Sequence, residues 1–116
     1  MNDDQKSREL WTRIISAIRN NPKEMVTIRQ DGSMGKWFLA SVVNGDLLIS
    51  NAKTNKPSTN IAVERRITEA EFIRTFPYYL RWQNQEYGIR QEAVRLASLN
   101  TSYIFALISF YGQQLL

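Results

Sequence analysis

Residues 37–50 read WFLASVVNGDLLIS, and this stretch decides the fold class. Its first part, residues 37–43, is rich in β-branched and aromatic residues that favour a strand. Asn44 and Gly45 both tolerate positive φ, which makes them a favoured pair for a two-residue hairpin turn. Residues 46–50 then supply the returning strand. The stretch therefore predicts an antiparallel hairpin within a sheet.

Segments on both sides extend this hairpin into a meander. Residues 25–28 read MVTI and predict a preceding strand. The intervening DGSMGK, residues 31–36, resembles a phosphate-binding loop only superficially, because two residues separate its glycines where that motif needs four. Residues 51–60 are polar and contain Pro57, so they predict a surface loop before a short strand over 61–67. We expect a sheet of three or four strands.

The strand over 37–43 is apolar on both of its faces. Because side chains alternate along a strand, Trp37 and Leu39 point to one face, whereas Phe38 and Ala40 point to the other. Such a strand is either covered on both sides within its own domain or lies in a sheet whose second face is covered by a partner.

Three helical segments flank the meander. Residues 3–20 carry apolar residues at spacings of three and four, which predicts a helix that ends before Pro22. Thr68 and Glu71 fit a capping box at the start of a second helix, which Pro77 is expected to interrupt. Residues 89–99 favour a helix, although alternation at 94, 96 and 98 leaves a strand open.

The final predicted helix, residues 103–111, is apolar around almost its whole circumference. Residues 100–102 can cap it, and Gly112 can end it. Because a small domain has little interior, this helix is either a central core element or part of a two-fold homodimer interface. We favour the homodimer, with five candidate interface residues: Trp37, Tyr103, Phe105, Phe110 and Tyr111.

The composition limits the kinds of chemistry that the chain can perform. The 116 residues fit one α+β domain, 1–116, and include neither cysteine nor histidine. This composition excludes thiolate chemistry and disulfides and removes the commonest general base and metal ligand. The acidic residues show no metal-binding spacing, so we expect no cofactor and no metal site, and we favour a non-catalytic role over an enzymatic one. The polar N-terminus carries Asp3 and Asp4, and the longest apolar run is well short of the ~20 residues that span a bilayer, so we expect a cytoplasmic protein.

The net charge of +4 raises the question of a polyanionic partner. The 15 basic residues are dispersed along the chain, and Arg65 and Arg66 are the only adjacent pair. A polyanion is therefore a suitable partner only if the fold gathers the positive charge on one surface.

Residues 78–90 read YYLRWQNQEYGIR and combine aromatic rings with guanidinium groups. Such a mixture can stack on a planar ligand, hold phosphate or carboxylate, or form an interface hot spot. The alternative is that the aromatic residues close the core while the polar ones face water. The candidate binding residues are Tyr78, Arg81, Trp82, Tyr87 and Arg90.

These features do not identify one biochemical activity. They favour a small non-catalytic binding or protein-interaction module that self-associates. One alternative is a nucleic-acid-binding protein that uses its dispersed basic residues and the 78–90 segment. Another is a small enzyme with a pocket that needs neither histidine nor cysteine.

Overall fold

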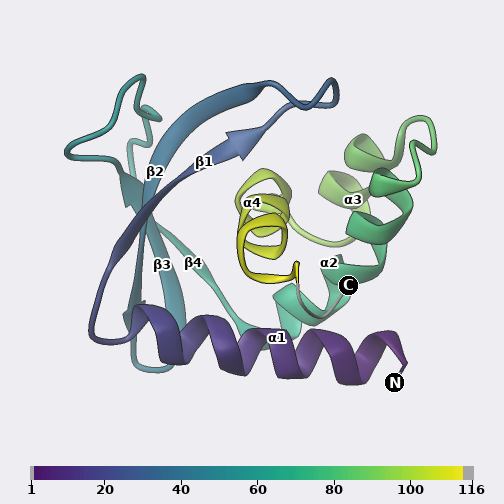
Figure 1. Ribbon diagram of the computed structural model, residues 1–116, viewed down its shortest axis with the longest axis horizontal. Helices are drawn as coiled ribbons and strands as arrows, with labels where there is room; N and C mark the ends of the chain where they lie inside the picture. The colour runs from purple at the N-terminus through teal and green to yellow at the C-terminus, as the bar shows by residue number, and fades with distance from the viewer. Residues whose placement is uncertain (1, 114–116) are drawn as a thin grey trace.

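The computed structural model describes residues 2–113 and has the predicted α+β organisation, with one helix, an antiparallel meander and three further helices. The strands are β1 (Lys23–Ile28), β2 (Met34–Val43), β3 (Asp46–Asn51) and β4 (Arg65–Ile67). The helices are α1 (Asp3–Ile18), α2 (Glu69–Gln83), α3 (Ile89–Leu96) and α4 (Thr101–Tyr111). The sheet curls around α4, while α1 closes one side and α2 and α3 lie opposite the sheet (Figure 1).

The four strands follow one another across the sheet in the order β1-β2-β3-β4, with antiparallel neighbours throughout. The predicted hairpin is confirmed, because Asn44 and Gly45 take φ values of 52° and 83° between β2 and β3. The strand predicted over 61–67 is wrong in its first half, since β4 begins only at Arg65. The Asn51 side chain bonds both the N–H and the carbonyl of Ile61, at 2.7 and 3.0 Å. These bonds replace the strand pairing expected there.

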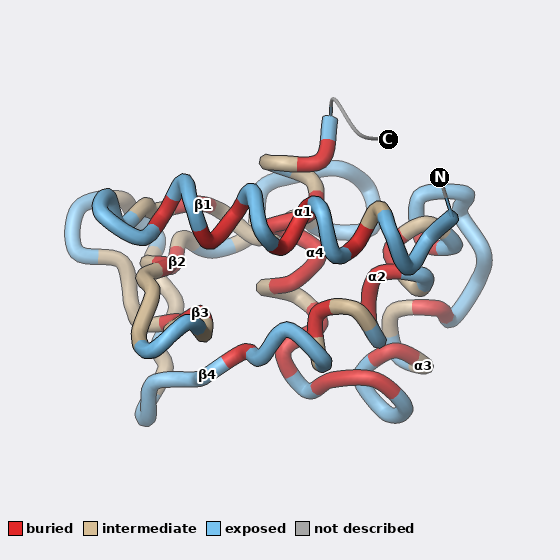
Figure 2. Tube along the Cα trace, turned by 90° about the horizontal axis from the view of Figure 1, so that it is seen from below, coloured by how far each residue is buried: buried red, intermediate tan, exposed pale blue. Residues whose placement is uncertain are grey.

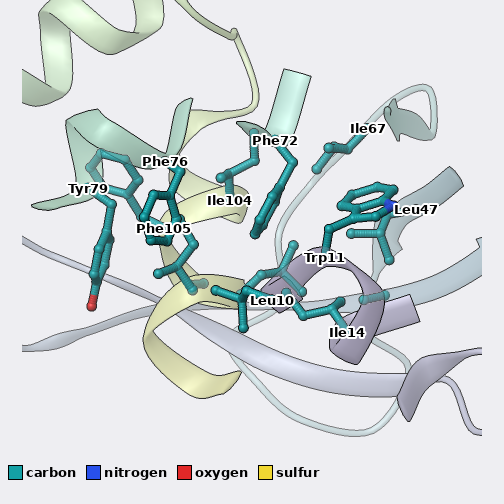
Figure 3. Close-up of a cluster of buried hydrophobic side chains, with 14 of the residues drawn as sticks. Leu10, Trp11, Ile14, Leu47, Ile67, Phe72, Phe76, Tyr79, Ile104 and Phe105 are labelled. Atoms are coloured by element: carbon teal, nitrogen blue, oxygen red, sulfur yellow. The ribbon is translucent and has the colours of Figure 1, made fainter. Parts of the chain in front are cut away.

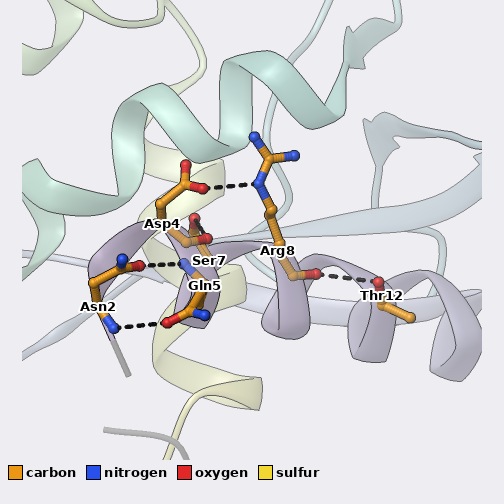
Figure 4. Close-up of polar contacts among 6 residues, drawn as sticks. All are labelled: Asn2, Asp4, Gln5, Ser7, Arg8 and Thr12. Atoms are coloured by element: carbon orange, nitrogen blue, oxygen red, sulfur yellow. Dashed lines mark hydrogen bonds and ion pairs between the residues drawn. The ribbon is translucent and has the colours of Figure 1, made fainter.

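Helix α1 begins with a reciprocal capping box. The Asn2 side chain accepts from the Gln5 N–H at 2.8 Å, and the Gln5 side chain accepts from the Asn2 N–H at 3.2 Å (Figure 4). Arg8 forms an ion pair with Asp4 one turn away, at 2.9 Å. The apolar face of α1 is buried, as its periodicity predicted, and the helix ends at Ile18.

Helix α2 runs unbroken through Pro77, so the predicted interruption is wrong. Pro77 lies on the exposed face of the helix, where the one missing backbone hydrogen bond is close to solvent. Phe72 and Phe76 before the proline and Tyr79 after it are all buried, so core packing holds both halves in line.

The capping box predicted at the start of α2 is half formed. Thr68 accepts from the Glu71 N–H at 3.2 Å, but the Glu71 carboxylate does not return to Thr68. It accepts instead from the Ser98 hydroxyl and from the Asn100 side-chain amide. The carboxylate therefore joins the start of α2 to the segment between α3 and α4.

Helix α4 is the central element of the core. Figure 2 shows it enclosed between the sheet, α1 and α2, and Figure 3 shows its side chains among those of these elements. The fully buried stretch of α4 runs over residues 104–108. Residues 89–96 form α3, which confirms the preference for a helix there. Among residues 2–113, no single helix is long and apolar enough to cross a membrane, and α3 and α4 reach that length only as a pair bent by 115°.

Candidate functional site

The structure separates the five binding residues predicted in the 78–90 segment. Trp82 is buried, with 8% of its surface exposed, and Tyr87 is fully exposed. Arg81 lies over the Tyr78 ring, 5.8 Å from its centroid, and forms ion pairs with Glu86 and Glu92 on the surface. The segment therefore does not form one binding surface.

Arg90 points toward the sheet instead. Its guanidinium lies over the rings of Trp82 and Phe105, 5.0 and 5.6 Å from their centroids. Its Nη2 donates to the Ile28 carbonyl of β1 at 2.7 Å, while its buried Nε has no hydrogen-bond partner. Burial lowers the pKa of this guanidinium below its ordinary value. Two aromatic rings and a backbone bond thus fix a cation between α3 and β1.

Arg90 forms part of the wall of a cleft of about 350 Å³, which we call the cationic cleft. The cleft also exposes Arg29 at the end of β1, Lys36 in β2 and Arg65 in β4. Its remaining side chains are hydroxyl-bearing or apolar, and no aspartate or glutamate contributes to the lining. Within residues 2–113, ion pairs form at Arg8, Arg66 and Arg81, and none of the four cleft cations takes part in one.

Close backbone packing holds one side of the cationic cleft. Thr27 Oγ1 accepts from the Lys36 N–H at 3.0 Å and so ties β1 to β2. A Cβ at Gly35 would lie 2.1 Å from that oxygen, so only glycine permits this approach. On the opposite side, Arg65 lies 5.9 Å from the ring centroid of Tyr103, in the first turns of α4.

Comparisons with protein-family models, with curated proteins and with solved structures find no match to this chain.

Sequence reasoning found Arg90 but missed the other three cations. Lys36 and Arg65 come from separate strands and Arg29 follows β1, and nothing in their spacing links them to α3. The pairing of the strands and the bond from Arg90 in α3 to the Ile28 carbonyl bring these four of the 15 basic residues together.

The predicted interface residues are also divided. Phe105 is fully buried, and Tyr103 packs edge-on against Phe38 at a centroid distance of 5.1 Å. Phe110 remains 51% exposed, and it lines a second concavity, of about 410 Å³, together with Trp37. We call this concavity the β1 groove, because five of its lining residues belong to β1.

Glu24, which also lines the β1 groove, has a structural task. Its carboxylate accepts from the backbone N–H groups of Asn55, Lys53 and Thr54 and from the Asn55 side chain, at 2.6 to 2.9 Å. These hydrogen bonds lower the pKa of Glu24 to about 2. The backbone bond from Asn55 is the largest cause, and the backbone bonds from Lys53 and Thr54 are smaller. The loop after β3 is thus anchored to β1 by a charged group.

Proposed function

We propose that this chain is a non-catalytic binding module that holds a phosphate group of its ligand in the cationic cleft. The observation that carries the proposal is the convergence of four cations on one concavity with no carboxylate among the lining residues. The repulsion between these cations is relieved when an anion lies between them.

The cleft offers more than net charge. Arg29, Arg65 and Arg90 carry planar guanidinium groups, which match the oxygen geometry of phosphate. Ser102 lies in the first turn of α4, where the helix dipole adds positive potential. Arg90 is already fixed by its two aromatic neighbours, so a ligand needs to order only the three exposed side chains.

The shape of the cleft favours phosphate over a nucleobase as the bound group. A volume of about 350 Å³ lies at the small end of the range of ligand sites, which runs from about 300 to 1,000 Å³. Trp82 lies behind Arg90 and is buried, so it provides no free ring face for stacking. Tyr103 is half-buried against Phe38. Recognition therefore rests on charge and hydrogen bonds.

Calorimetric titration with inorganic pyrophosphate at low salt tests the proposal. The Lys36→Gln/Arg65→Gln double variant removes two cleft charges from exposed positions. The Arg13→Gln/Arg19→Gln variant removes the same net charge from exposed positions in α1 and at its C-terminal cap, and serves as the matched control. Because each hydrogen bond to a charged group contributes about 1.5–3 kcal/mol, we expect the cleft variant to bind at least about tenfold more weakly. Equal weakening in both variants would show that binding depends on overall charge and would reject the cleft.

A second titration, with an eight-nucleotide single-stranded DNA, separates two sources of the phosphate. Single-stranded nucleic acid loses affinity with a log–log salt slope of about −0.7 per phosphate contact, so four contacts predict a slope near −3. A slope of this size, with affinity above that of pyrophosphate, would support the nucleic-acid alternative. Binding of pyrophosphate alone would point to a small phosphorylated ligand.

A further inference from the structure

Strand β1 forms one edge of the sheet, and the register shows which of its backbone groups point outward. The N–H and carbonyl of Trp37 bond Pro57 and Thr59, both at 2.8 Å, and therefore face away from β1. Val26 is the antiparallel partner of Trp37, so this is a pair without mutual hydrogen bonds. Val26 and, two residues earlier, Glu24 consequently direct their N–H and carbonyl groups away from β2.

These outward groups are unpaired in the described part of the chain. No hydrogen bond found within residues 2–113 uses the backbone N–H or carbonyl of Glu24 or Val26 outside the sheet ladder. Beyond them, the register shifts before Ile28, whose carbonyl accepts from Arg90. The free part of the edge, at Glu24 and Val26, is therefore a short template for an added strand, and it ends where Arg90 bonds Ile28.

The β1 groove runs along this template. Met25, Ala106 and Phe110 contribute to its lining from β1 and α4, while Val26 and Trp37 contribute from the other face of the sheet. Phe110 is 51% exposed, although it is a large apolar residue. An extended strand placed here would pair with the free backbone groups and cover this apolar surface in the same step.

The β1 groove is lined by one ammonium group and one carboxylate, those of Lys23 and Glu24. Glu24 is occupied by the four donors from residues 53–55. Lys23 has its Nζ 5.0 Å from the ring centroid of Phe110 and forms no ion pair within residues 2–113. Lys23 and Met25 share one face of β1, so a partner strand can present a carboxylate and an apolar side chain to them two positions apart.

We propose that the β1 groove binds an extended peptide segment of a partner protein, which adds to β1 as a fifth strand. The segment carries an acidic and an apolar residue at alternate positions on its inward face. A second copy of this chain fits less well, because its own β1 edge presents another groove and another Lys23 where a ridge and a carboxylate are needed. The proposal is independent of anion binding in the cationic cleft.

The test uses the blocked, fluorescently labelled peptide STETVTTS, in which Glu and Val stand two positions apart. Binding is followed by anisotropy, and its site by amide chemical shifts of the ¹⁵N-labelled full chain. We expect the largest shifts at the amides of Glu24 and Val26. Two N-methylated versions, one modified at odd and one at even positions, examine the backbone pairing. Only one of them is expected to lose binding, because alternate amides of an added strand face the edge.

Two variants of the chain test the side-chain contacts. Phe110→Glu is expected to weaken binding at least tenfold, whereas Val63→Glu, at a position that is 78% exposed, is expected to leave it within twofold. Lys23→Glu is expected to reverse the preference, so that STKTVTTS binds better than STETVTTS. This reversal keeps the proposal testable even if Phe110→Glu fails to fold.

Three results would overturn the proposal. The first is equal binding by both N-methylated peptides, which would exclude pairing with the strand edge. The second is an unchanged preference in Lys23→Glu. The third is self-association of the free protein that Phe110→Glu abolishes, since it would assign the groove to a second copy.

Discussion

At the scale of single residues, the ionised carboxylate of Glu24 holds the loop of residues 53–55 in place. Its pKa of about 2 in the folded protein lies below the ordinary value of 4.5. Its contribution to stability is therefore complete above pH 4.5 and is lost as the pH falls toward 2. We expect Glu24→Gln to lower the denaturation midpoint at pH 7 and to remove this part of the acid dependence.

Hydrogen exchange of the amides of Lys53, Thr54 and Asn55 checks the Glu24 prediction directly. Their protection should fall in Glu24→Gln and, in the unmodified chain, as the pH falls below 4.5. Glu64→Gln, which alters an exposed carboxylate, is the control. Equal protection in Glu24→Gln and Glu64→Gln would show that the carboxylate does not hold the loop.

Arg90 is expected to contribute both to the stability of the fold and to the proposed anion binding. Arg90→Lys keeps the charge but loses the planar contact with Trp82 and Phe105. A cation–π contact contributes about 0.5–2 kcal/mol, so we expect thermal unfolding to show a loss of about 1–2 kcal/mol. We also expect weaker pyrophosphate binding. Unchanged stability would mean that the stacking contributes nothing to the position of this cation.

At the scale of elements, α4 shows a clear contrast between its core and its exposed side. Phe105 is fully buried, so Phe105→Ala is expected to destabilise the fold by about 3–5 kcal/mol. Phe110→Ala alters a half-exposed side chain and is expected to cost less than about 1 kcal/mol. Denaturant titration of the two variants measures the difference. Similar costs would contradict the central position of α4.

Some elements could be predicted from the sequence, and others depend on tertiary contacts. The helix over 3–18, the Asn44–Gly45 hairpin and the helix over 89–96 depend on local periodicity and turn chemistry, so they could be predicted. The continuity of α2 through Pro77 depends on Phe72, Phe76 and Tyr79 packing into the core. The late start of β4 depends on the Asn51 side chain, ten residues from Ile61. Neither of these tertiary effects has a local signal.

At the scale of the whole molecule, the enclosure of α4 bears on the predicted homodimer. One chain already buries residues 104–108, which include Phe105, one of the five predicted interface residues. Phe110 and Trp37 remain available in the β1 groove. We therefore expect sedimentation equilibrium to show a monomer at micromolar concentration. A dimer would restore the self-association prediction, and a dimer that Phe110→Glu abolishes would contradict the peptide inference.

The cationic cleft also depends on the whole fold, because no single element contains it. The dispersed basic residues gave no reason to expect a charged surface, and the four cleft cations come from the end of β1, from β2, from β4 and from α3. Arg90 was predicted for its aromatic neighbours in the sequence. Its actual role depends on Phe105 and Ile28, which are distant in sequence.

The most direct measurement for the central claim is an NMR titration of the ¹⁵N-labelled chain with inorganic pyrophosphate, followed at the backbone amides and at the arginine Nε–H groups. We expect saturable shifts at Arg29, Lys36, Arg65 and Arg90, with the α1 arginines unmoved. Absence of shifts at low salt, or shifts spread evenly over all arginines, would contradict it.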